Sequence, residues 1–552
     1  MVLAEQSLLQ GILALTIAWF IWRAVRSVFI KSPFDGIPGP SAESWFKGNF
    51  GQFFHRDSWE FHDELADKYE SVVKLNGLFG RKGLFVFDPR ALHHIFVKDQ
   101  WAYERPRWFN NSLTIGFGPG LLSITGEQHR KHRKMLNPVF SIKHMRHMTP
   151  IFYQVANNLR EGINNQLKGS TQEVDILRWM HRTALELVGQ GGLGHSFDPL
   201  TDPGYYSEYA QAMKDFFPTV FSLSVWRIVS DIFHGVGSRQ LRRWIVEKLP
   251  SRRVQHLKHI VDVMDASTRE ILRTKRAALA AGDEAVVQQV AKGNDILSIL
   301  LRANMDASDA DRLDEAELSG EMSILVFAAT DTTTSAMTRT LHLLAERPDV
   351  QEKVRKEIQE ARTAAGGDIP HDQLMTLPYL DAICRETLRL YSPVTFVNRE
   401  TWQDVVLPLS KPIRKEDGSM IQEIHIPKGT YVASGIRAIN RNTEIWGEDA
   451  REWKPERWLS PLPETVTEAH IPGVYSNLMT FIGGSRACIG FKFSQLEMKV
   501  ILSVLLTSFE CSLPDCKDDL FWNLSGVFYP TVGKDSNSPS FPMKLTPIET
   551  HA

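Results

Sequence analysis

The sequence contains only four cysteines among 552 residues, at positions 384, 488, 511 and 516. So few cysteines exclude a disulfide scaffold and are typical of a reducing compartment, where most thiols are buried and inert. Net charge is also almost absent, because 63 Lys and Arg stand against 65 Asp and Glu. A nucleic-acid-binding protein needs a clustered basic surplus to neutralise phosphates, so this class is excluded. Hydrophobic residues make up 43% of the chain, which excludes intrinsic disorder.

One long stretch lacks charge altogether, because residues 7–22 read SLLQGILALTIAWFIW. The run is apolar on all faces, which favours a membrane-spanning helix over a buried amphipathic one. The basic residues Arg23, Arg26 and Lys31 follow this run, which is atypical of a cleaved signal peptide and predicts that the remaining chain is cytosolic. We expect three parts: a membrane anchor over 1–30, a stiff proline-rich hinge over 31–45, and a folded body over 46–552.

The body has a mainly helical hydrophobic pattern, without internal repeats or low-complexity tracts. Helices are expected at 57–69, 126–135, 145–167, 174–193, 254–281, 318–346, 348–365, 377–390 and 488–509. Strand-like segments are few and short, at 72–75, 83–87 and 405–407. The aromatic and basic stretch 216–261 fits either core packing, which we favour, or a second surface in contact with lipid. The expected fold class is mainly α with small β-sheets.

One cysteine stands in a glycine-rich loop, Phe481-Ile482-Gly483-Gly484-Ser485-Arg486-Ala487-Cys488-Ile489-Gly490, directly before a helical segment. Glycines let a flat group approach the backbone closely, and a sulfur at the start of a helix gains amide donors that favour the thiolate. A thiolate as the sole protein ligand prepares haem iron for oxygen cleavage. Zinc is a poor alternative, because no second Cys or His lies at ligand spacing.

This loop has the pattern Phe-x-x-Gly-x-Arg-x-Cys-x-Gly and resembles the haem-binding signature of the cytochrome P450 family. The resemblance implies the P450 fold and a haem b whose axial ligand is Cys488. It further implies that Phe481, Gly484 and Gly490 shape the haem-binding loop, and that Arg486 pairs with a haem propionate. It extends from the proline-rich segment to the C-terminus and leaves no space for a fused reductase domain.

Glu386-Thr387-Leu388-Arg389 resembles the family's Glu-x-x-Arg motif, and Pro455-Glu456-Arg457-Trp458 resembles its later arginine segment. Further Glu-x-x-Arg copies start at positions 127, 270, 352 and 448, where an exposed pair is the better interpretation. Only the copy at Glu386 is followed by the arginine segment and then by the cysteine loop. The resemblance implies a structural, non-catalytic triad of Glu386, Arg389 and Arg457 beneath the haem.

Ala328-Ala329-Thr330-Asp331-Thr332-Thr333 resembles the motif of the family's long helix on the oxygen side of the haem. Asp331 is the only charged residue between positions 321 and 339, and a carboxylate in an apolar helix is costly unless it is partnered or at work. The residues alone also allow a simple helix bend in a core. The resemblance implies that Thr332 helps to hold dioxygen and that Asp331 relays protons. Ala329 occupies the family's glycine position, so the local helix distortion stays open.

The segment from Gly126 to Arg133 resembles the family's helix with a Trp/His-x-x-x-Arg pair, which places His129 and Arg133 at the haem propionates. A solvated basic face is the alternative. Arg399 resembles another propionate-binding arginine of the family. Four further cations are expected to form a positive patch for an acidic electron donor: Arg130, Lys131, Lys134 and Lys492.

These resemblances imply a haem-dependent monooxygenase over 46–552 that hydroxylates or epoxidises a lipophilic small molecule with O₂, in fungal specialised, terpenoid-like metabolism. Electrons are expected from NADPH through a separate NADPH–cytochrome P450 reductase, with a single-pass anchor in the endoplasmic reticulum membrane and a cytosolic catalytic domain. The expected pocket walls are mostly apolar, at 109–122, 327–329, 394–397 and 527–529. Two alternatives stay open: a peroxide isomerase or dehydratase on the same fold, and a non-catalytic haem or lipid carrier.

Overall fold

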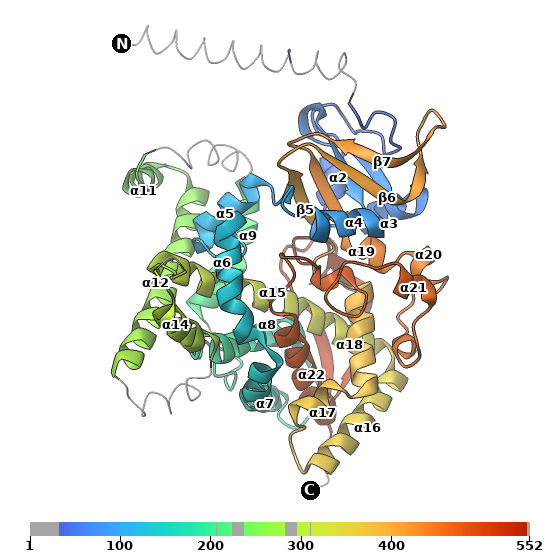
Figure 1. Ribbon diagram of the computed structural model, residues 1–552. Helices are drawn as coiled ribbons and strands as arrows, with labels where there is room; N and C mark the ends of the chain where they lie inside the picture. Colours follow the sequence, from blue (N-terminus) through green and yellow to red (C-terminus); the bar gives the residue numbers. More distant parts are fainter. Residues whose placement is uncertain are drawn as a thin grey trace.

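The structure is a computed structural model that describes residues 22, 32–205, 207–223, 237–281, 295–309 and 311–548. Helices form the larger part of the molecule, and most strands gather in a smaller part beside them (Figure 1). The expected mainly α class with small sheets is confirmed. Among the described residues, no helix combines the length and apolarity needed to cross a membrane. The expected anchor over 1–30 lies outside the described residues except for Trp22.

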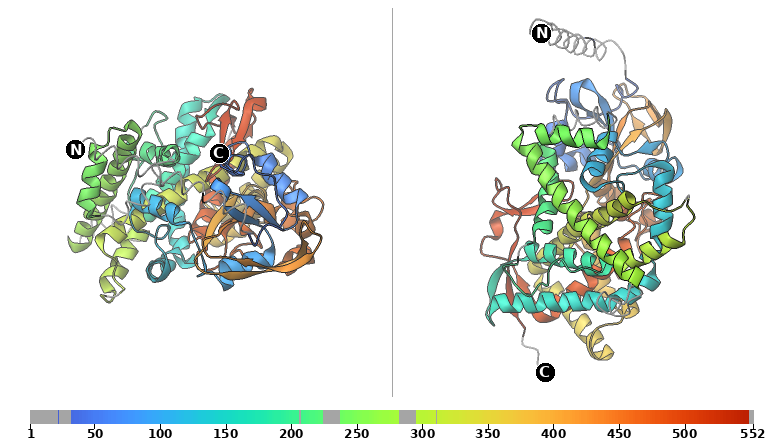
Figure 2. Two further views of the ribbon diagram at one scale, coloured as in Figure 1. Left: turned by 90° about the horizontal axis from the view of Figure 1, so that it is seen from above. Right: turned by 90° about the vertical axis from the view of Figure 1, so that its left-hand side faces the viewer.

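The α-helices described by the structure are α2 (Phe50–Phe54), α3 (Trp59–Lys68), α4 (Pro89–His93), α5 (Arg107–Phe117), α6 (Gly126–Leu136), α7 (Ile142–Leu167), α8 (Ile176–Leu187), α9 (Glu208–Ser222), α11 (Arg239–Lys248), α12 (Arg252–Ala281), α14 (Ile296–Asp306), α15 (Glu315–Glu346), α16 (Pro348–Ala365), α17 (His371–Met375), α18 (Pro378–Leu390), α19 (Ile436–Asn440), α20 (Thr443–Trp446), α21 (Glu464–Glu468) and α22 (Phe491–Ser508). The long helix α12 lies on the outside of the helical part and packs on α9 and α15 (Figure 2).

The largest sheet has the strand order β1-β2-β8-β5-β3, with β2 and β8 parallel and the other pairs antiparallel. Its strands are β1 (Val72–Asn76), β2 (Lys82–Val86), β3 (Tyr103–Glu104), β5 (Phe396–Thr401) and β8 (Tyr431–Gly435). The smaller sheets pair β6 (Val405–Arg414) with β7 (Met420–Ile426), β10 (Leu520–Asn523) with β11 (Tyr529–Val532), and β12 (Pro542–Pro547) with both β4 (Gln172–Asp175) and β9 (Phe509–Ser512).

Several expected helices begin one to three residues later than their hydrophobic patterns predict, and two of them show the reason. The helix expected over 174–193 starts at Ile176, because the preceding residues pair with β12 as β4 and the Asp175 side chain caps α8. The helix expected from position 488 starts at Phe491, after Gly490 as its N-cap. Both changes place a polar or glycine residue, not an apolar one, at the helix boundary.

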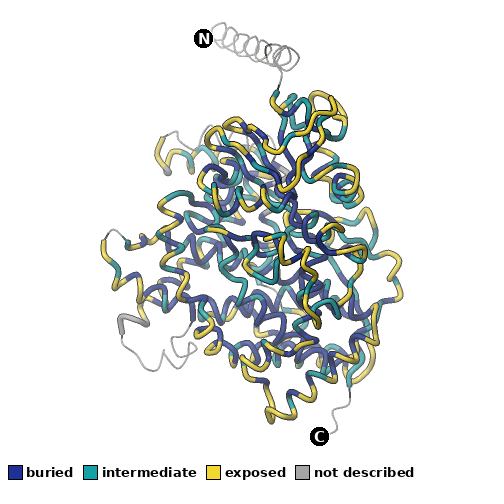
Figure 3. The backbone as a smooth tube through the Cα atoms, turned by 45° about the vertical axis from the view of Figure 1, so that its right-hand side comes forward, coloured by how far each residue is buried: buried dark blue, intermediate teal, exposed yellow. Residues whose placement is uncertain are grey.

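Buried residues form two hydrophobic cores, seen as dark segments within the tube in Figure 3. The larger core surrounds α15 and α22, and the smaller one packs around the five-stranded sheet. Part of the expected hinge, the segment 32–40, lies on this smaller core, since Phe34 and Ile37 are buried in it. The Lys74 amide of β1 donates to the Pro38 carbonyl at 2.9 Å, so this segment is fixed to the sheet.

Candidate active site

Cys488 lies between the short helix Met479–Phe481 and α22. Its amide N–H donates to the Phe481 carbonyl oxygen at 2.9 Å, which closes the loop before the cysteine. Burial raises the pKa of the Cys488 thiol, whereas the Gly490 amide and the Arg133 guanidinium act to lower it. The loop thus holds an amide donor and a cation that would stabilise a thiolate ligand.

The two predicted glycines of the loop have different environments. Gly484 has a φ of +73°, and a Cβ there would lie 1.7 Å from the Phe96 carbonyl oxygen. Glycine is therefore required at 484 by the contact with this neighbouring backbone. At Gly490 an added Cβ would meet nothing within 4 Å, so the loop is open on that side. The open space beside Gly490 is consistent with the approach of a flat group. Gly484, in contrast, is required by its close packing against the Phe96 backbone.

Three arginines and a histidine from distant parts of the chain influence one another near this loop. Arg486 belongs to the loop, Arg399 to β5 and His129 to α6, while Arg105 follows β3. Burial lowers the pKa of Arg105, and repulsion from Arg486 and Arg399 lowers it further. Burial also lowers the pKa of Arg399 to about 10, with Arg486 adding to the shift. For His129, burial followed by Arg486 and Arg105 lowers the pKa to about 3, so its imidazole is neutral near pH 7.

Two polar atoms of this cluster are buried without a hydrogen-bond partner among the described residues, namely Arg399 Nη2 and His129 Nδ1. Buried polar atoms of this kind are costly unless a ligand satisfies them. Guanidinium groups with free donors fit carboxylates, and a haem carries two of them. The donor set therefore fits the propionates, which Arg105, Arg399, Arg486 and His129 would hold while Cys488 binds the iron. A thiolate-ligated haem supplies the activation of oxygen.

Arg105 and its neighbour Glu104 are members of this cluster that sequence reasoning missed. Glu104 accepts from Arg486 Nη2 at 2.9 and 3.1 Å, and both side chains are at most 8% exposed. In the sequence they belong to the segment Tyr103-Glu104-Arg105-Pro106, which matches none of the motifs that the sequence analysis used. Only the pairing of β3 with β5 brings them to Arg399, so a long-range strand contact was needed to find them.

Arg133 lies at the cysteine loop itself. Its Nη1 donates to the Ala487 carbonyl at 2.5 Å, and its Nε donates to Asn137 at 2.9 Å. Arg133 also lowers the pKa of His129, so both predicted residues of α6 face the same region. The surface cations of α6 have partners of their own: Arg130 pairs with Glu127, Lys134 with Asp311, and Lys131 donates to the Arg312 carbonyl. The expected positive patch is thus partly neutralised in the free chain.

The helix α15 carries Asp331 and Thr332 and runs without interruption past Ala329. The Thr332 hydroxyl donates to the Ala328 carbonyl at 2.8 Å. Phe327, Ala328, Ala329, Asp331 and Thr332 are only half-buried, although the helix crosses the larger core and its next turns are buried. On the other side, the buried Glu497 carboxyl of α22 contacts Thr333, and burial raises its pKa well above the ordinary value. The open face of α15 therefore carries the predicted acid and alcohol.

Two of the four expected pocket walls contact each other directly, and a third is hydrogen-bonded to residues next to the other walls. The ring of Phe117, at the end of α5, stacks on Phe327 of α15 with centroids 4.8 Å apart. The Ser335 hydroxyl of α15 donates to the Phe528 carbonyl at 2.8 Å, and the Phe528 amide donates to the Pro393 carbonyl. Phe216 of α9 opens the stretch expected to pack in the core, and it is buried there; its ring centroid lies 4.6 Å from that of Phe117, although no expected pocket wall included it.

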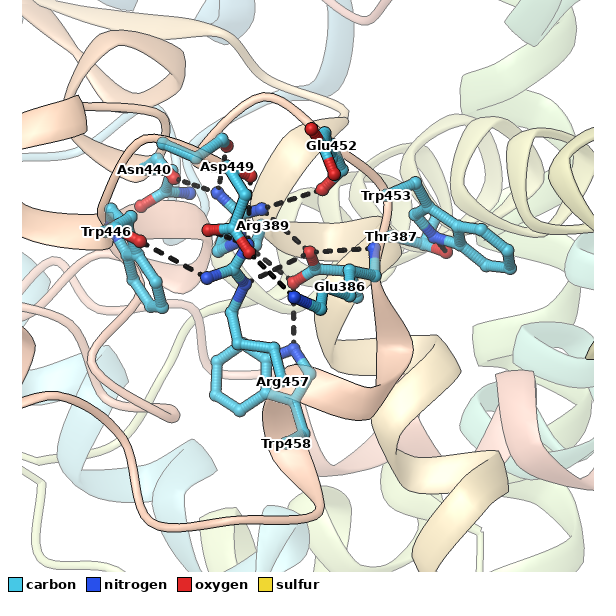
Figure 4. Close-up of polar contacts among 12 residues, drawn as sticks. Glu386, Thr387, Arg389, Asn440, Trp446, Asp449, Glu452, Trp453, Arg457 and Trp458 are labelled. Carbon is cyan, nitrogen blue, oxygen red and sulfur yellow. Dashed lines mark hydrogen bonds and ion pairs between the residues drawn. The ribbon is translucent and has the colours of Figure 1, made fainter.

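The structure brings Glu386, Arg389 and Arg457 together in one network, in which Glu386 and Arg389 are fully buried (Figure 4). Arg389 donates two hydrogen bonds to the Glu386 carboxylate, at 2.8 and 2.7 Å, and Arg457 Nε lies 3.4 Å from the same carboxylate. The remaining donors of Arg389 bind backbone carbonyls, among them those of Asn440 and Ala450, and Arg457 also pairs with the Asp449 carboxylate at 2.8 Å. This network connects α18 with the loops that precede the cysteine segment, so the triad lies where it can stabilise the fold.

The comparisons with known proteins agree with this geometry. The family model "Cytochrome P450" matches residues 38–531. Cytochrome P450 monooxygenase 91 of Postia placenta is 54% identical over 542 residues, which cover 98% of this chain and 99% of the relative. Ganoderic acid synthetase CYP5150L8 of Ganoderma lucidum is 44% identical over 532 residues, or 96% of each chain. The solved structure of retinoic acid-bound cyanobacterial CYP120A1 covers 93% of this chain with a TM-score of 0.68 and 20% identity, which shows the fold.

The fold and the site define a haem-thiolate enzyme, and the chain belongs to the cytochrome P450 family. It is an oxidoreductase of the monooxygenase type that binds haem iron. The predicted family, fold, enzyme class and cofactor are therefore confirmed.

Proposed function

We propose that this monooxygenase hydroxylates or epoxidises a terpenoid-like lipophilic molecule, with electrons from NADPH through a separate reductase. The observation that carries the proposal is the half-buried face of α15, which presents Asp331 and Thr332 next to the aromatic Phe117–Phe327 stack. An apolar wall favours a substrate with little polarity, and the acid–alcohol pair suits proton delivery during oxygen chemistry. The relative named as a ganoderic acid synthetase supports a terpenoid substrate.

The test combines a spectrum with product analysis. The reduced full-length protein should give the red-shifted carbon monoxide band of a thiolate-ligated haem, and Cys488→Ser should abolish it while Cys384→Ser should not. With the reductase and NADPH, a panel of terpenoids should then yield mono-oxygenated products. Turnover of a hydroperoxide without reductase would favour an isomerase or dehydratase. Binding of terpenoids without turnover in either assay would favour a carrier.

We further propose that the chain is held at the endoplasmic reticulum membrane, with its catalytic domain in the cytosol. The apolar segment 7–22 supports this proposal. So does an exposed aromatic cluster around α2, made of Trp45, Phe46, Phe50 and Phe54, which are 38–54% exposed. Trp244 of α11 is 56% exposed, and α11 lies at the same end of the molecule as α2 (Figures 1 and 2). Aromatic side chains of this kind favour the membrane–water interface.

Flotation with liposomes tests this arrangement. The full chain should float with the lipid, and deletion of residues 1–30 should weaken flotation without abolishing it. In the deleted protein, Phe46→Ser with Phe50→Ser should remove the remaining binding, while Met420→Ser with Val406→Ser, which changes exposed apolar residues of β6 and β7, should not. A truncated protein that stays with the lipid after the first pair of changes would contradict the role of α2.

A further inference from the structure

The site contains one buried carboxylate that the haem-binding pattern does not explain. Glu104 is 4% exposed and lies among three guanidinium groups. It forms an ion pair with Arg486 at 2.9 Å, and its charge raises the pKa of Arg105 and of Arg399 against the stronger lowering by burial. A carboxylate placed here competes with the negative groups that the arginines would bind. Its presence at the centre of an anion site therefore requires a reason.

The net charge of the cluster explains why a carboxylate lies there. Arg105, Arg399 and Arg486 contribute three positive charges, and His129 contributes none, because its pKa is about 3. Glu104 lowers the sum to two, which equals the charge of the two haem propionates. Without Glu104, one uncompensated positive charge would remain in a region that is largely removed from water, where charge imbalance is expensive.

The neighbouring ionisable groups do not change this count. Arg133 donates to the Ala487 carbonyl at the cysteine loop, so its guanidinium lies at this loop; burial lowers the pKa of Arg133, and Cys488 opposes that shift. The other buried acids near α6, Glu317 and Glu321, are bound by His132, and Glu317 also by Gln128. Among the described residues, Glu104 is the carboxylate that pairs with a cluster arginine, Arg486, and its charge also acts on Arg105 and Arg399.

We propose that Glu104 is a built-in counter-charge that neutralises the third arginine of the haem-propionate site and thereby sets the reduction equilibrium of the haem. Glu104 acts through Arg486 and the surrounding field, so it is a positioning residue. A negative charge near the iron favours the ferric over the ferrous state, because reduction adds negative charge. Loss of the Glu104 charge should therefore favour the ferrous haem. The inference rests on the haem and needs neither the substrate nor the reductase.

A spectroelectrochemical titration of the full-length holoenzyme tests this proposal. Glu104→Gln keeps the side-chain shape and an oxygen acceptor for Arg486 but removes the charge, and it should shift the ferric–ferrous equilibrium toward ferrous by about three- to tenfold. Glu104→Asp keeps the charge and should stay near wild type. The matched control is Asp198→Asn, which removes the carboxylate of another buried pair, Arg182–Asp198 at 2.6 Å, outside the arginine cluster.

A second variant keeps the proposal testable if Glu104→Gln loses haem. Arg105→Gln removes a positive charge from the same cluster and should shift the equilibrium in the opposite direction, toward ferric haem. In the double variant Glu104→Gln with Arg105→Gln the original sum is restored, and the equilibrium should return toward wild type. The proposal is overturned if Glu104→Gln leaves the equilibrium unchanged, if Glu104→Asp shifts it as much as Glu104→Gln, or if the two single variants shift it in the same direction.

Discussion

The imidazole Nδ1 of His181 lies 3.5 Å from the Asp331 carboxylate Oδ1. His181 belongs to α8, which packs along α15, and its side chain is 18% exposed while that of Asp331 is 42% exposed. Among the residues that the structure describes, His181 is the basic group within 4 Å of this carboxylate. An imidazole can hold the carboxylate in position and can both take up and release a proton. This geometry places His181 where it can exchange a proton with the relay proposed for Asp331 and Thr332.

We predict that His181→Gln impairs proton delivery without loss of haem. More of the oxygen should then be released as peroxide, by about three- to tenfold, which is less than the full effect of losing a general acid or base. The measurement is peroxide formed and NADPH consumed per O₂, which needs no knowledge of the organic substrate. His259→Gln is the control, because His259 faces a carboxylate at 3.7 Å in an exposed pair. An equal increase in an Asp331→Asn background would show that His181 does not act through Asp331.

The triad should determine whether the protein folds around haem. Glu386→Gln removes the carboxylate that, within the described part of the chain, alone pairs with Arg389, whose side chain is fully buried. Breaking a buried pair in this way costs about 3–5 kcal/mol of folding free energy. We expect a strongly reduced yield of haem-containing protein and a lower urea midpoint, measured by the Soret absorbance during denaturation. The control is Glu64→Gln, which breaks an exposed Lys68 pair and should change the midpoint little.

The pocket prediction concerns the Phe117–Phe327 stack. Phe327→Ala removes one ring of a pair whose interaction is worth about 0.5–1.5 kcal/mol beyond area burial. A terpenoid-sized ligand should bind about two- to tenfold more weakly, and the distribution of oxidised products should broaden because the wall next to Asp331 is lost. Spectral titration and product analysis measure the two effects. Phe541→Leu in the buried core is a control that should leave the product distribution unchanged. Unchanged affinity and products in Phe327→Ala would place the substrate elsewhere.

The sequence predicts the parts of this molecule that depend on local order and fails where distant segments meet. The Cys488 loop, the Glu386 motif and the α15 motif each occupy one short segment, so spacing and residue type were sufficient to find them. Glu104 and Arg105 reach the site only through the pairing of β3 with β5, and His181 only through the packing of α8 on α15. Neither contact leaves a periodic pattern in the sequence. The same limit applies to α5 and α9, whose aromatic residues make contact only in the folded chain.

A further prediction concerns acid stability and starts from a histidine outside the active site. His62 of α3 is 5% exposed, and its Nε2 lies 2.9 Å from the Phe53 carbonyl oxygen. Burial lowers its pKa from 6.5 to about 4, so the folded protein keeps the imidazole neutral where the unfolded chain is protonated. Because the unfolded state then binds more protons, stability falls as the pH is lowered from about 6.5 to 4. The shift corresponds to about 3 kcal/mol at the lower end of this range.

His62→Gln removes the titrating group and retains a donor that can reach the Phe53 carbonyl. The variant should therefore lose less stability than the wild type between pH 6.5 and pH 4, even if it is somewhat less stable at pH 7.5. Urea midpoints at several pH values, followed by tryptophan fluorescence, measure the difference. His425→Gln changes a histidine that is 75% exposed and should leave the acid sensitivity of the wild type intact. Parallel stability curves for wild type and His62→Gln over this interval would show that another buried group dominates the acid response.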